Sequence, residues 1–263
     1  MKSVNQEVRY RTIGRVKLEI HPTSRAAGEA AARAAAAEFH RLGSVGKDFG
    51  VIFATGASQM DTLEALTSIQ DLPWKYVLGF HMDEYVGLSE DHPASFRRYL
   101  RERLTRRVAM KRFFEMEGNP DRIESIAREY AKELEAANPQ LCLLGIGENG
   151  HLAFNDPAEA DFDDPLPIKV VTLDEACRQQ QVSEGWFKSR EEVPRQALTL
   201  TMPTLFRVPK LILSVPGLRK ANAVRRTLED DISTACPATI LRKHPGATIY
   251  LDVDSASALN RID

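Results

Sequence analysis

The feature of this 263-residue sequence that most restricts its fold is the alternation of short apolar runs with segments of helical spacing. Residues 51–54 and 141–146 are almost entirely apolar, and a glycine-containing turn follows each of them at once. Similar runs occupy 76–82 and 211–215, and residues 14–20 alternate apolar with polar side chains. Short apolar strands that alternate with helices are typical of a parallel sheet covered on both faces. We therefore predict an α/β fold, a Rossmann-like open sheet that is mainly parallel, with helices on both faces.

The segments between these strands have the composition of helices. Thr23 and Ser24 precede an alanine-rich stretch that extends to Leu42, and both residue types are favoured as helix N-caps. Helices are also expected over 93–104 and 218–229. No fixed-period repeat and no Gly/Pro/Ser-rich linker divides the sequence, so a single domain over residues 1–263 is expected.

In an open α/β sheet, ligands bind beyond the carboxyl ends of the strands, near the point where the strand order reverses. The loops that follow the predicted apolar strands are therefore the candidate site loops. They are 55–59, 82–88, 146–157 and 216–220.

Composition excludes several classes of function. Lys and Arg number 35 against 37 Asp and Glu, which gives a net charge of −2 and argues against nucleic-acid binding. No run of 18 apolar residues occurs, so no membrane-spanning helix is expected. Cys142, Cys177 and Cys236 are odd in number and far apart, which indicates neither a disulfide framework nor a zinc cluster and makes the cytoplasm the expected compartment.

The turn Thr55-Gly56-Ala57-Ser58 lies where a strand leads into a helix, and such a turn directs backbone N–H groups and the positive end of the helix dipole at one point. A phosphate group suits that position, although a plain turn with an N-cap has the same composition. Lys220 lies at the start of another helix after a strand, where an anion would offset its unfavourable interaction with the helix dipole. The neighbouring Arg219 is expected to reach solvent or pair with an acid.

Two further loops carry groups suited to proton transfer. Asp83 and Glu84 are adjacent acids at a strand end, and they should face opposite ways, so one of them could act as a base beside a carbonyl or imine. Alternatively, Asp83 caps a turn and Glu84 points to water. His151 lies in a glycine-rich loop with Asp156 five residues later, and its imidazole can both accept and donate protons near neutrality. The acidic stretch 156–164 lacks the spacing of a calcium loop and is expected to be solvated, so no metal is predicted.

Three motifs in these loops resemble the glucosamine-6-phosphate deaminase family, within a larger group that includes the 6-phosphogluconolactonases. They are A-T-G-A-S at 54–58, F-H-M-D-E-Y-V-G-L at 80–88 and G-I-G-E-N-G-H-L-A-F-N-D-P at 145–157, and the resemblance covers roughly residues 45 to 255. It implies a hexosamine phosphate as small-molecule substrate, which is converted to fructose 6-phosphate and ammonia without a metal or cofactor. A homo-oligomer is compatible with it.

The resemblance also implies roles for individual residues. Asp83 would move a proton between C2 and C1 of the sugar, and His151 would help to open the pyranose ring with support from Asn149 and Asp156. The residues implied to hold the phosphate are Gly56, Ala57, Ser58 and Lys220.

The sequence departs from the family pattern at several of these positions. Asn149 stands where many members have Asp, and Asp156 replaces the more usual Glu. Residues 158–161 are partly acidic where allosteric members hold an effector phosphate, so such activation is not expected. An arginine that the family uses on the phosphate should fall near 181–187, where none occurs. The candidate substitutes for it are Arg178, Lys188 and Arg190.

Three alternatives remain beside a glucosamine-6-phosphate deaminase. One is another sugar-phosphate isomerase or deaminase, including one for the galactosamine epimer. A second is a 6-phosphogluconolactonase, although lactonases of this group typically carry Arg where Tyr85 stands. The third is a non-catalytic sugar-phosphate sensor, which would need neither Asp83 nor His151.

Overall fold

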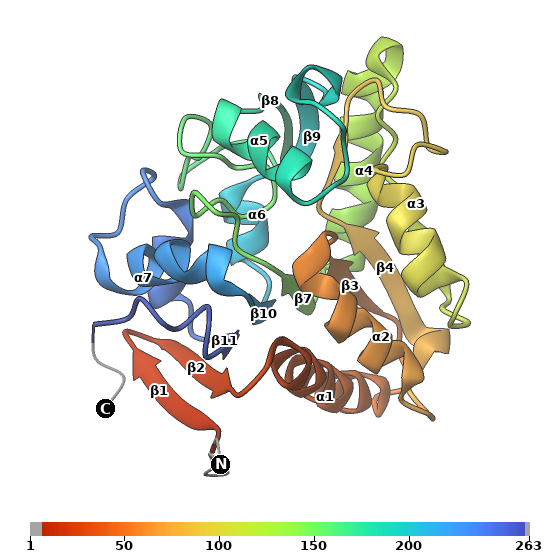
Figure 1. Ribbon diagram of the computed structural model, residues 1–263. Helices are drawn as coiled ribbons and strands as arrows, with labels where there is room; N and C mark the ends of the chain where they lie inside the picture. The colour runs from red at the N-terminus through yellow and green to blue at the C-terminus, as the bar shows by residue number, and fades with distance from the viewer. Residues whose placement is uncertain (1–6, 261–263) are drawn as a thin grey trace.

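The structure, a computed structural model, describes residues 7–260, and its centre is an eight-stranded sheet (Figure 1). Neighbouring strands are parallel except for the antiparallel pair at one edge, formed by the first two strands. In order across the sheet the strands are β1 (Arg9–Ile13), β2 (Val16–His21), β11 (Ala247–Asp252), β10 (Lys210–Ser214), β7 (Leu141–Leu144), β3 (Phe49–Phe53), β4 (Val77–His81) and β6 (Arg112–Phe114). The predicted Rossmann-like, mainly parallel sheet is therefore confirmed. Of the expected single domain, residues 1–6 and 261–263 lie outside the described part.

Helices cover both faces of this sheet and bury two separate apolar cores. On one face lie α1 (Ser24–Gly43) and α2 (Met60–Ser68), and on the other lie α4 (Ile123–Ala137) and α7 (Ala221–Glu229). Alternate residues of one strand enter opposite cores: Val51 and Phe53 of β3 pack with α1, whereas Ile52 packs with α4. This two-sided burial explains why β3 and β7 read as continuous apolar runs in the sequence.

The alanine-rich segment forms α1, as predicted. The Thr23 side chain caps it, since Thr23 Oγ1 accepts a hydrogen bond of 3.1 Å from the backbone N–H of Ala26. The small side chains let α1 approach its neighbour closely, and a Cβ atom added at Gly28 would lie 2.5 Å from Cβ of Asp61 in α2. The composition of this helix is therefore set by packing against α2 and the sheet.

A second, antiparallel sheet of three strands was not predicted. Its strands are β5 (Asp83–Tyr85), β9 (Gln196–Leu200) and β8 (Ile168–Thr172), in that order. The predicted loop 82–88 is therefore wrong in part, because its centre pairs with β9. A three-residue strand is too short for its periodicity to be visible in the sequence.

The remaining helices are short. They are α3 (Phe96–Leu100), α5 (Glu175–Ser183) and α6 (Met202–Phe206). The helix predicted over 93–104 begins later, at Phe96, and continues from α3 into a π-helical turn over Arg101–Thr105. Across residues 7–260 no helix combines the length and the apolarity that crossing a membrane requires.

Candidate active site

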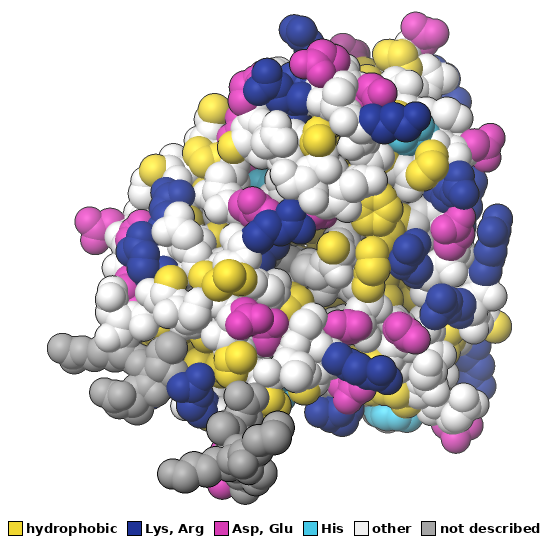
Figure 2. All heavy atoms as spheres, in the orientation of Figure 1, with side chains coloured by type: hydrophobic (Ala, Val, Ile, Leu, Met, Phe, Trp, Pro, Cys, Tyr) yellow, Lys and Arg dark blue, Asp and Glu magenta, His cyan; other side chains and the backbone are white. Residues whose placement is uncertain are grey.

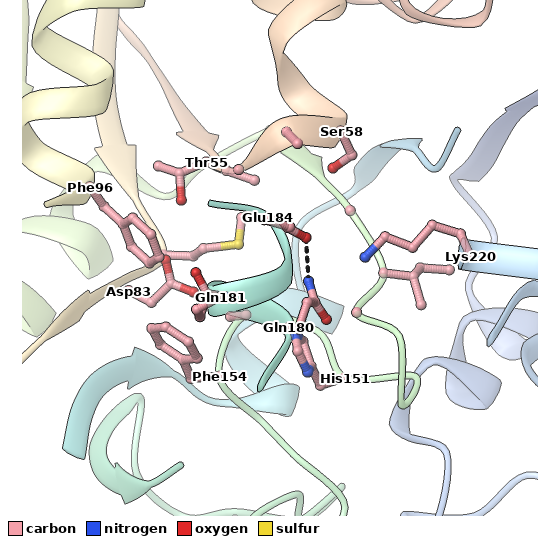
Figure 3. A pocket seen from close by; sticks show the side chains of 18 residues that line it. Thr55, Ser58, Asp83, Phe96, His151, Phe154, Gln180, Gln181, Glu184 and Lys220 are labelled. Atoms are coloured by element: carbon pink, nitrogen blue, oxygen red, sulfur yellow. Dashed lines mark hydrogen bonds between the residues drawn. The ribbon is translucent and has the colours of Figure 1, made fainter. Parts of the chain in front are cut away.

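A pocket lies where the four predicted site loops meet, at the carboxyl ends of β3, β4, β7 and β10 (Figure 3). The chain order reverses between β3 and β7, because the chain runs outward from β3 through β4 and β6 and then returns to the other side of β3. The pocket is therefore at the switch point of the sheet. Its lining includes Thr55, Gly56, Ala57, Ser58, Asp83, Phe96, Gly147, His151, Phe154, Gln180, Gln181, Glu184 and Lys220. Seen from the side of Figure 1, the surface is hollowed near its centre, and charges of both signs are interspersed around it (Figure 2).

Two turns of similar geometry border the pocket. After β3, Gly56 has a φ of +93° and opens a 3-10 turn, Ala57–Gln59, that runs into α2. After β10, Gly217 has a φ of +96° and opens the turn Leu218–Lys220, which runs into α7. The first N–H groups of such a turn have no partner within the helix, so both turns offer donors to an anion. The positive φ angles are the reason that glycine is needed at both positions.

Gln59 holds these strand ends together, and sequence reasoning missed it. Its side chain is almost fully buried, and its Nε2 donates to the carbonyl oxygens of Leu144 (3.2 Å) and Ser214 (3.3 Å), the last residues of β7 and β10. A glutamine at a helix start has no motif around it, so only the structure identifies this role.

Lys220 is the cationic side chain that lines the pocket, and only 8% of it is exposed. Burial lowers its pKa, while the negative charges of Glu184 and Glu148 act in the opposite direction. Among the described residues no carboxylate oxygen lies within ion-pair distance of its amino group. Arg219, by contrast, is more than half exposed, donates to the Ser183 carbonyl (3.1 Å) and lies 3.7 Å from Glu148, as expected of a surface residue.

The two adjacent acids of β5 face opposite ways, as predicted. Asp83 lines the pocket, whereas the fully buried Glu84 carboxylate accepts hydrogen bonds at the start of α3. Its donors include Ser95 Oγ (2.9 Å), the backbone N–H of Arg97 (3.0 Å) and Arg97 Nε (3.2 Å). The alternative in which Glu84 points to water is therefore wrong. This carboxylate instead fixes β5, and with it Asp83, against α3.

The environment of Asp83 is that of a carboxyl group with raised proton affinity. Only 6% of the residue is exposed, and no described residue donates a hydrogen bond to its carboxylate. Burial, and then the nearby charge of Glu84, raise its pKa well above the usual range. A carboxylate in this state can take a proton from carbon more readily than an exposed one can.

The glycine-rich loop after β7 packs closely against the His151 side chain. A Cβ atom added at Gly147 would lie 2.2 Å from His151 Nε2, so only glycine fits there. The Gly147 N–H donates to the His151 carbonyl (2.9 Å), and Gly150 has a φ of +91°. Ala153 also has a positive φ of +51°, which is uncommon for a residue other than glycine. The loop thus brings the imidazole directly to the pocket wall.

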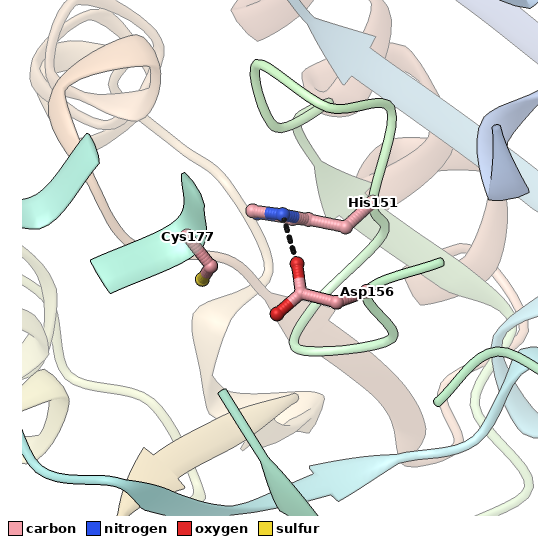
Figure 4. Close-up of side chains that lie close together, drawn as sticks. All are labelled: His151, Asp156 and Cys177. Atoms are coloured by element: carbon pink, nitrogen blue, oxygen red, sulfur yellow. Dashed lines mark ion pairs between the residues drawn. The ribbon is translucent and has the colours of Figure 1, made fainter. Parts of the chain in front are cut away.

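Asp156 and Asn149 are absent from the pocket lining, and Figure 4 shows the Asp156 carboxylate directed at the His151 ring. His151 Nδ1 is 2.8 Å from Asp156 Oδ1, which leaves Nε2 as the atom available to a ligand. Asn149 Nδ2 donates to the same carboxylate (2.9 Å), and Asn149 Oδ1 accepts from the His151 backbone N–H (3.0 Å). Burial opposes ionisation of Asp156, but the positive charge of His151 and these hydrogen bonds outweigh it and lower its pKa. The pair therefore orients the imidazole.

Cys177 lies close to this pair, and His151, Asp156 and Cys177 together have the ligand types of a metal site (Figure 4). The separation of 2.8 Å between Nδ1 and Oδ1 is that of a hydrogen bond. It is shorter than the roughly 3.3 Å between neighbouring ligands of a tetrahedral zinc ion. Burial raises the pKa of the Cys177 thiol well above its usual range, whereas zinc binds the thiolate. The arrangement fits a hydrogen-bonded network better than a metal centre.

None of the three candidate substitutes for the missing arginine reaches the pocket. The Arg178 guanidinium donates to the Val193 carbonyl (3.2 Å), and Arg190 pairs with Glu175 (2.7 Å). Lys188 is also absent from the pocket lining. The expectation that one of these three residues replaces the family's phosphate-binding arginine is therefore wrong. Helix α5 and the residue after it contribute Gln180, Gln181 and Glu184 instead.

Comparisons with known proteins agree with this geometry. A sequence profile of the glucosamine-6-phosphate isomerases and 6-phosphogluconolactonases matches residues 22–250. The glucosamine-6-phosphate deaminase of Thermoanaerobacter pseudethanolicus is 33% identical over 212 residues, which are 78% of this chain and 82% of that protein. A solved monomeric glucosamine-6-phosphate deaminase is 32% identical, with a TM-score of 0.84, over 92% of this chain and 99% of that one.

The shared fold extends further, to proteins of lower sequence identity. The 6-phosphogluconolactonase of Trypanosoma brucei has a TM-score of 0.75 at 20% identity and covers 95% of this chain with all of its own. At that identity the likeness concerns the fold alone. The profile match and the relatives above 30% identity show that this chain belongs to the family of glucosamine-6-phosphate isomerases and 6-phosphogluconolactonases.

Proposed function

We propose that this protein is a glucosamine-6-phosphate deaminase, which converts glucosamine 6-phosphate and water to fructose 6-phosphate and ammonia. The names of its relatives support this activity, including the deaminases of Thermoanaerobacter pseudethanolicus and of Corynebacterium glutamicum, the latter 33% identical over 88% of this chain. The observation that carries the proposal is that Asp83 and His151 line one pocket together with the Gly56–Ser58 turn and Lys220.

The anion end of the pocket suits the phosphate of the substrate. The backbone N–H groups of the turn at Gly56, Ala57 and Ser58 would bind its oxygens, and the Lys220 amino group would add a positive charge. Binding energy from this remote group positions the sugar for reaction.

The reaction itself needs two proton transfers at different places on the sugar. His151 Nε2 would take the proton of the C1 hydroxyl and return it to the ring oxygen, which opens the pyranose to the aldehyde. Asp83 would then remove the proton from C2 and deliver it to C1, while the C2 ammonium group loses a proton and O1 gains one, which leaves a hydroxyl group at C1 and an iminium group at C2. Water adds to this iminium group, and ammonia leaves with fructose 6-phosphate as the other product. The separate positions of the imidazole and the carboxyl on the pocket wall support this division of work.

One observation favours the deaminase over the lactonase. Tyr85, at the position where the resemblance places an arginine in lactonases, is fully buried. Its ring packs against those of Phe96 (5.0 Å between centroids), Phe154 (5.2 Å) and Phe187 (5.6 Å). An arginine at this position would be surrounded by aromatic rings and would lack a partner for its charge.

The direct test supplies the purified protein with glucosamine 6-phosphate and follows ammonia with a coupled glutamate dehydrogenase assay. Galactosamine 6-phosphate is measured in parallel, and Asp83→Asn serves as the inactive control. We expect ammonia and fructose 6-phosphate in equal amounts. If neither hexosamine phosphate releases ammonia and 6-phosphogluconolactone is opened instead, the proposal is wrong.

A further inference from the structure

The pocket contains a carboxylate that the proposed reaction does not use. Glu184 caps the end of α5 and lines the pocket, and Figure 3 shows the amino group of Lys220 directed into the same part of it. Two donors hold this carboxylate: Gln180 Nε2 donates to Oε1 (2.8 Å), and Trp186 Nε1 donates to Oε2 (3.2 Å). Glu184 is therefore oriented by its neighbours rather than free to turn into solvent.

These neighbours also contact residues at the phosphate-binding end of the pocket, where the Gly56–Ser58 turn lies. The ring of Trp186 packs edge-on against Tyr99 (6.0 Å between centroids), and the Tyr99 hydroxyl donates to the Gly56 carbonyl (2.8 Å). On the other side, Gln180 Oε1 accepts from the Glu148 backbone N–H (3.0 Å). The carboxylate is thus built into the wall that includes the Gly56–Ser58 turn.

The charge balance at this end of the pocket is unusual for a phosphate site. Lys220 is the one cationic side chain in the pocket lining, and the other charged groups there are Asp83, Glu184 and, when protonated, His151. Glu184 attracts the Lys220 amino group, and a phosphate group bound to that amino group would be repelled by Glu184. The carboxylate occupies the stretch 181–187, where the family resemblance led us to expect a cation.

We propose that Glu184 lowers the affinity of the pocket for phosphate by competing with the bound phosphate group for Lys220. The site then holds a phosphate group by the backbone N–H groups and by the Lys220 amino group, which Glu184 also attracts. It therefore binds inorganic phosphate weakly. The repulsion weakens the binding of both ligands, but a sugar phosphate gains further contacts from the sugar and inorganic phosphate does not, so the carboxylate keeps the affinity for the inorganic anion low. This inference rests on the proposed function for the identity of the sugar phosphate, whereas the binding of inorganic phosphate can be measured without it.

The test is the affinity for inorganic phosphate, measured by titration calorimetry without turnover. We expect Glu184→Gln, which removes the charge and keeps the shape, to lower the Kd for phosphate about tenfold, equivalent to about 1.4 kcal/mol. With glucosamine 6-phosphate, KM should fall while kcat stays within about threefold. The matched control is Glu192→Gln, because Glu192 lies in the same region but accepts from the exposed Lys188 backbone N–H and is absent from the pocket. Its Kd for phosphate should equal that of the wild type.

Thermal unfolding verifies that the variants are folded, and Glu184→Ala takes the place of the amide variant if the latter does not fold. An unchanged or raised Kd for phosphate in the Glu184 variant would overturn the inference. Loss of kcat with an unchanged Kd would also overturn it, because it would place Glu184 in the chemistry. Absence of ammonia release in the wild type would refute the proposed function and leave the phosphate titration interpretable.

Discussion

Replacing Asp83 by Asn should strongly slow the proposed reaction and also stabilise the folded protein, relative to wild type, as the pH rises above about 4. Asn has nearly the same shape as Asp, but it cannot accept a proton from carbon. General-base catalysis contributes about 10² to 10⁴ in rate, so kcat should fall by that factor while KM changes little. The stability effect arises because the wild-type carboxylate is buried at 6% exposure without a hydrogen-bond donor among the described residues.

The direction of the pH dependence follows from the raised pKa of Asp83. Below the pKa of an aspartate in the unfolded chain, about 3.9, Asp83 carries its proton in both the folded and the unfolded wild-type protein. Its ionisation therefore contributes nothing to the stability difference between wild type and variant at that pH. As the pH rises toward the pKa of the folded state, the unfolded chain ionises first, and wild-type stability falls by up to about 1.4 kcal/mol per pH unit. Above the folded pKa the loss is complete. The Asn variant has no such loss.

The size of the effect can be bounded. A single tenfold change in proton affinity is worth about 1.4 kcal/mol, and 1 kcal/mol moves the Tm of a chain of this size by about 2–4 °C. Compared with the difference at pH 4, the Tm of Asp83→Asn relative to wild type should therefore rise by at least about 3 °C at pH 8.

The assay is a series of thermal melts of both proteins from pH 4 to pH 8, with kcat/KM of the wild type measured across the same range. The pH above which wild-type stability stops falling should coincide with the acidic limb of the activity profile, because both report ionisation of the Asp83 carboxyl in the folded protein. A Tm difference that does not change with pH, or an Asn variant that retains kcat, would refute the reasoning.

Other substitutions test the remaining parts of the site. His151→Gln should lower kcat about 10² to 10⁴-fold in the ammonia assay, since the amide cannot exchange the ring-opening proton; a normal kcat would remove His151 from the chemistry. Lys220→Ala should mainly raise KM, and an unchanged KM would place the phosphate elsewhere. Gly147→Ala should reduce kcat in a folded protein, because the added Cβ would lie 2.2 Å from His151 Nε2; full activity would show that the loop adjusts. Glu84→Gln should lower the Tm, because it weakens the buried contacts with Ser95 and Arg97 that join β5 to α3.

Much of the fold follows from local sequence. The apolar runs that form β3, β7 and β10 lie within about two residues of their predicted positions, and Thr23 caps α1 as expected. These features are readable because a strand buried on both faces must be continuously apolar, and a helix start needs a side-chain acceptor. The predicted alternation of strands and helices was sufficient to place the four site loops at one edge of the sheet.

The sequence by itself therefore determined the class of fold, the loops that meet, and the residues Asp83, His151 and Lys220 that line one pocket. It could not show the small sheet that directs Asp83 and Glu84 to opposite sides, since β5 pairs with β9 more than a hundred residues away. Nor could it show that Glu184 lines the same pocket as Lys220. Those features depend on which distant segments pack together, and the energies of such contacts have no counterpart in local periodicity or residue spacing.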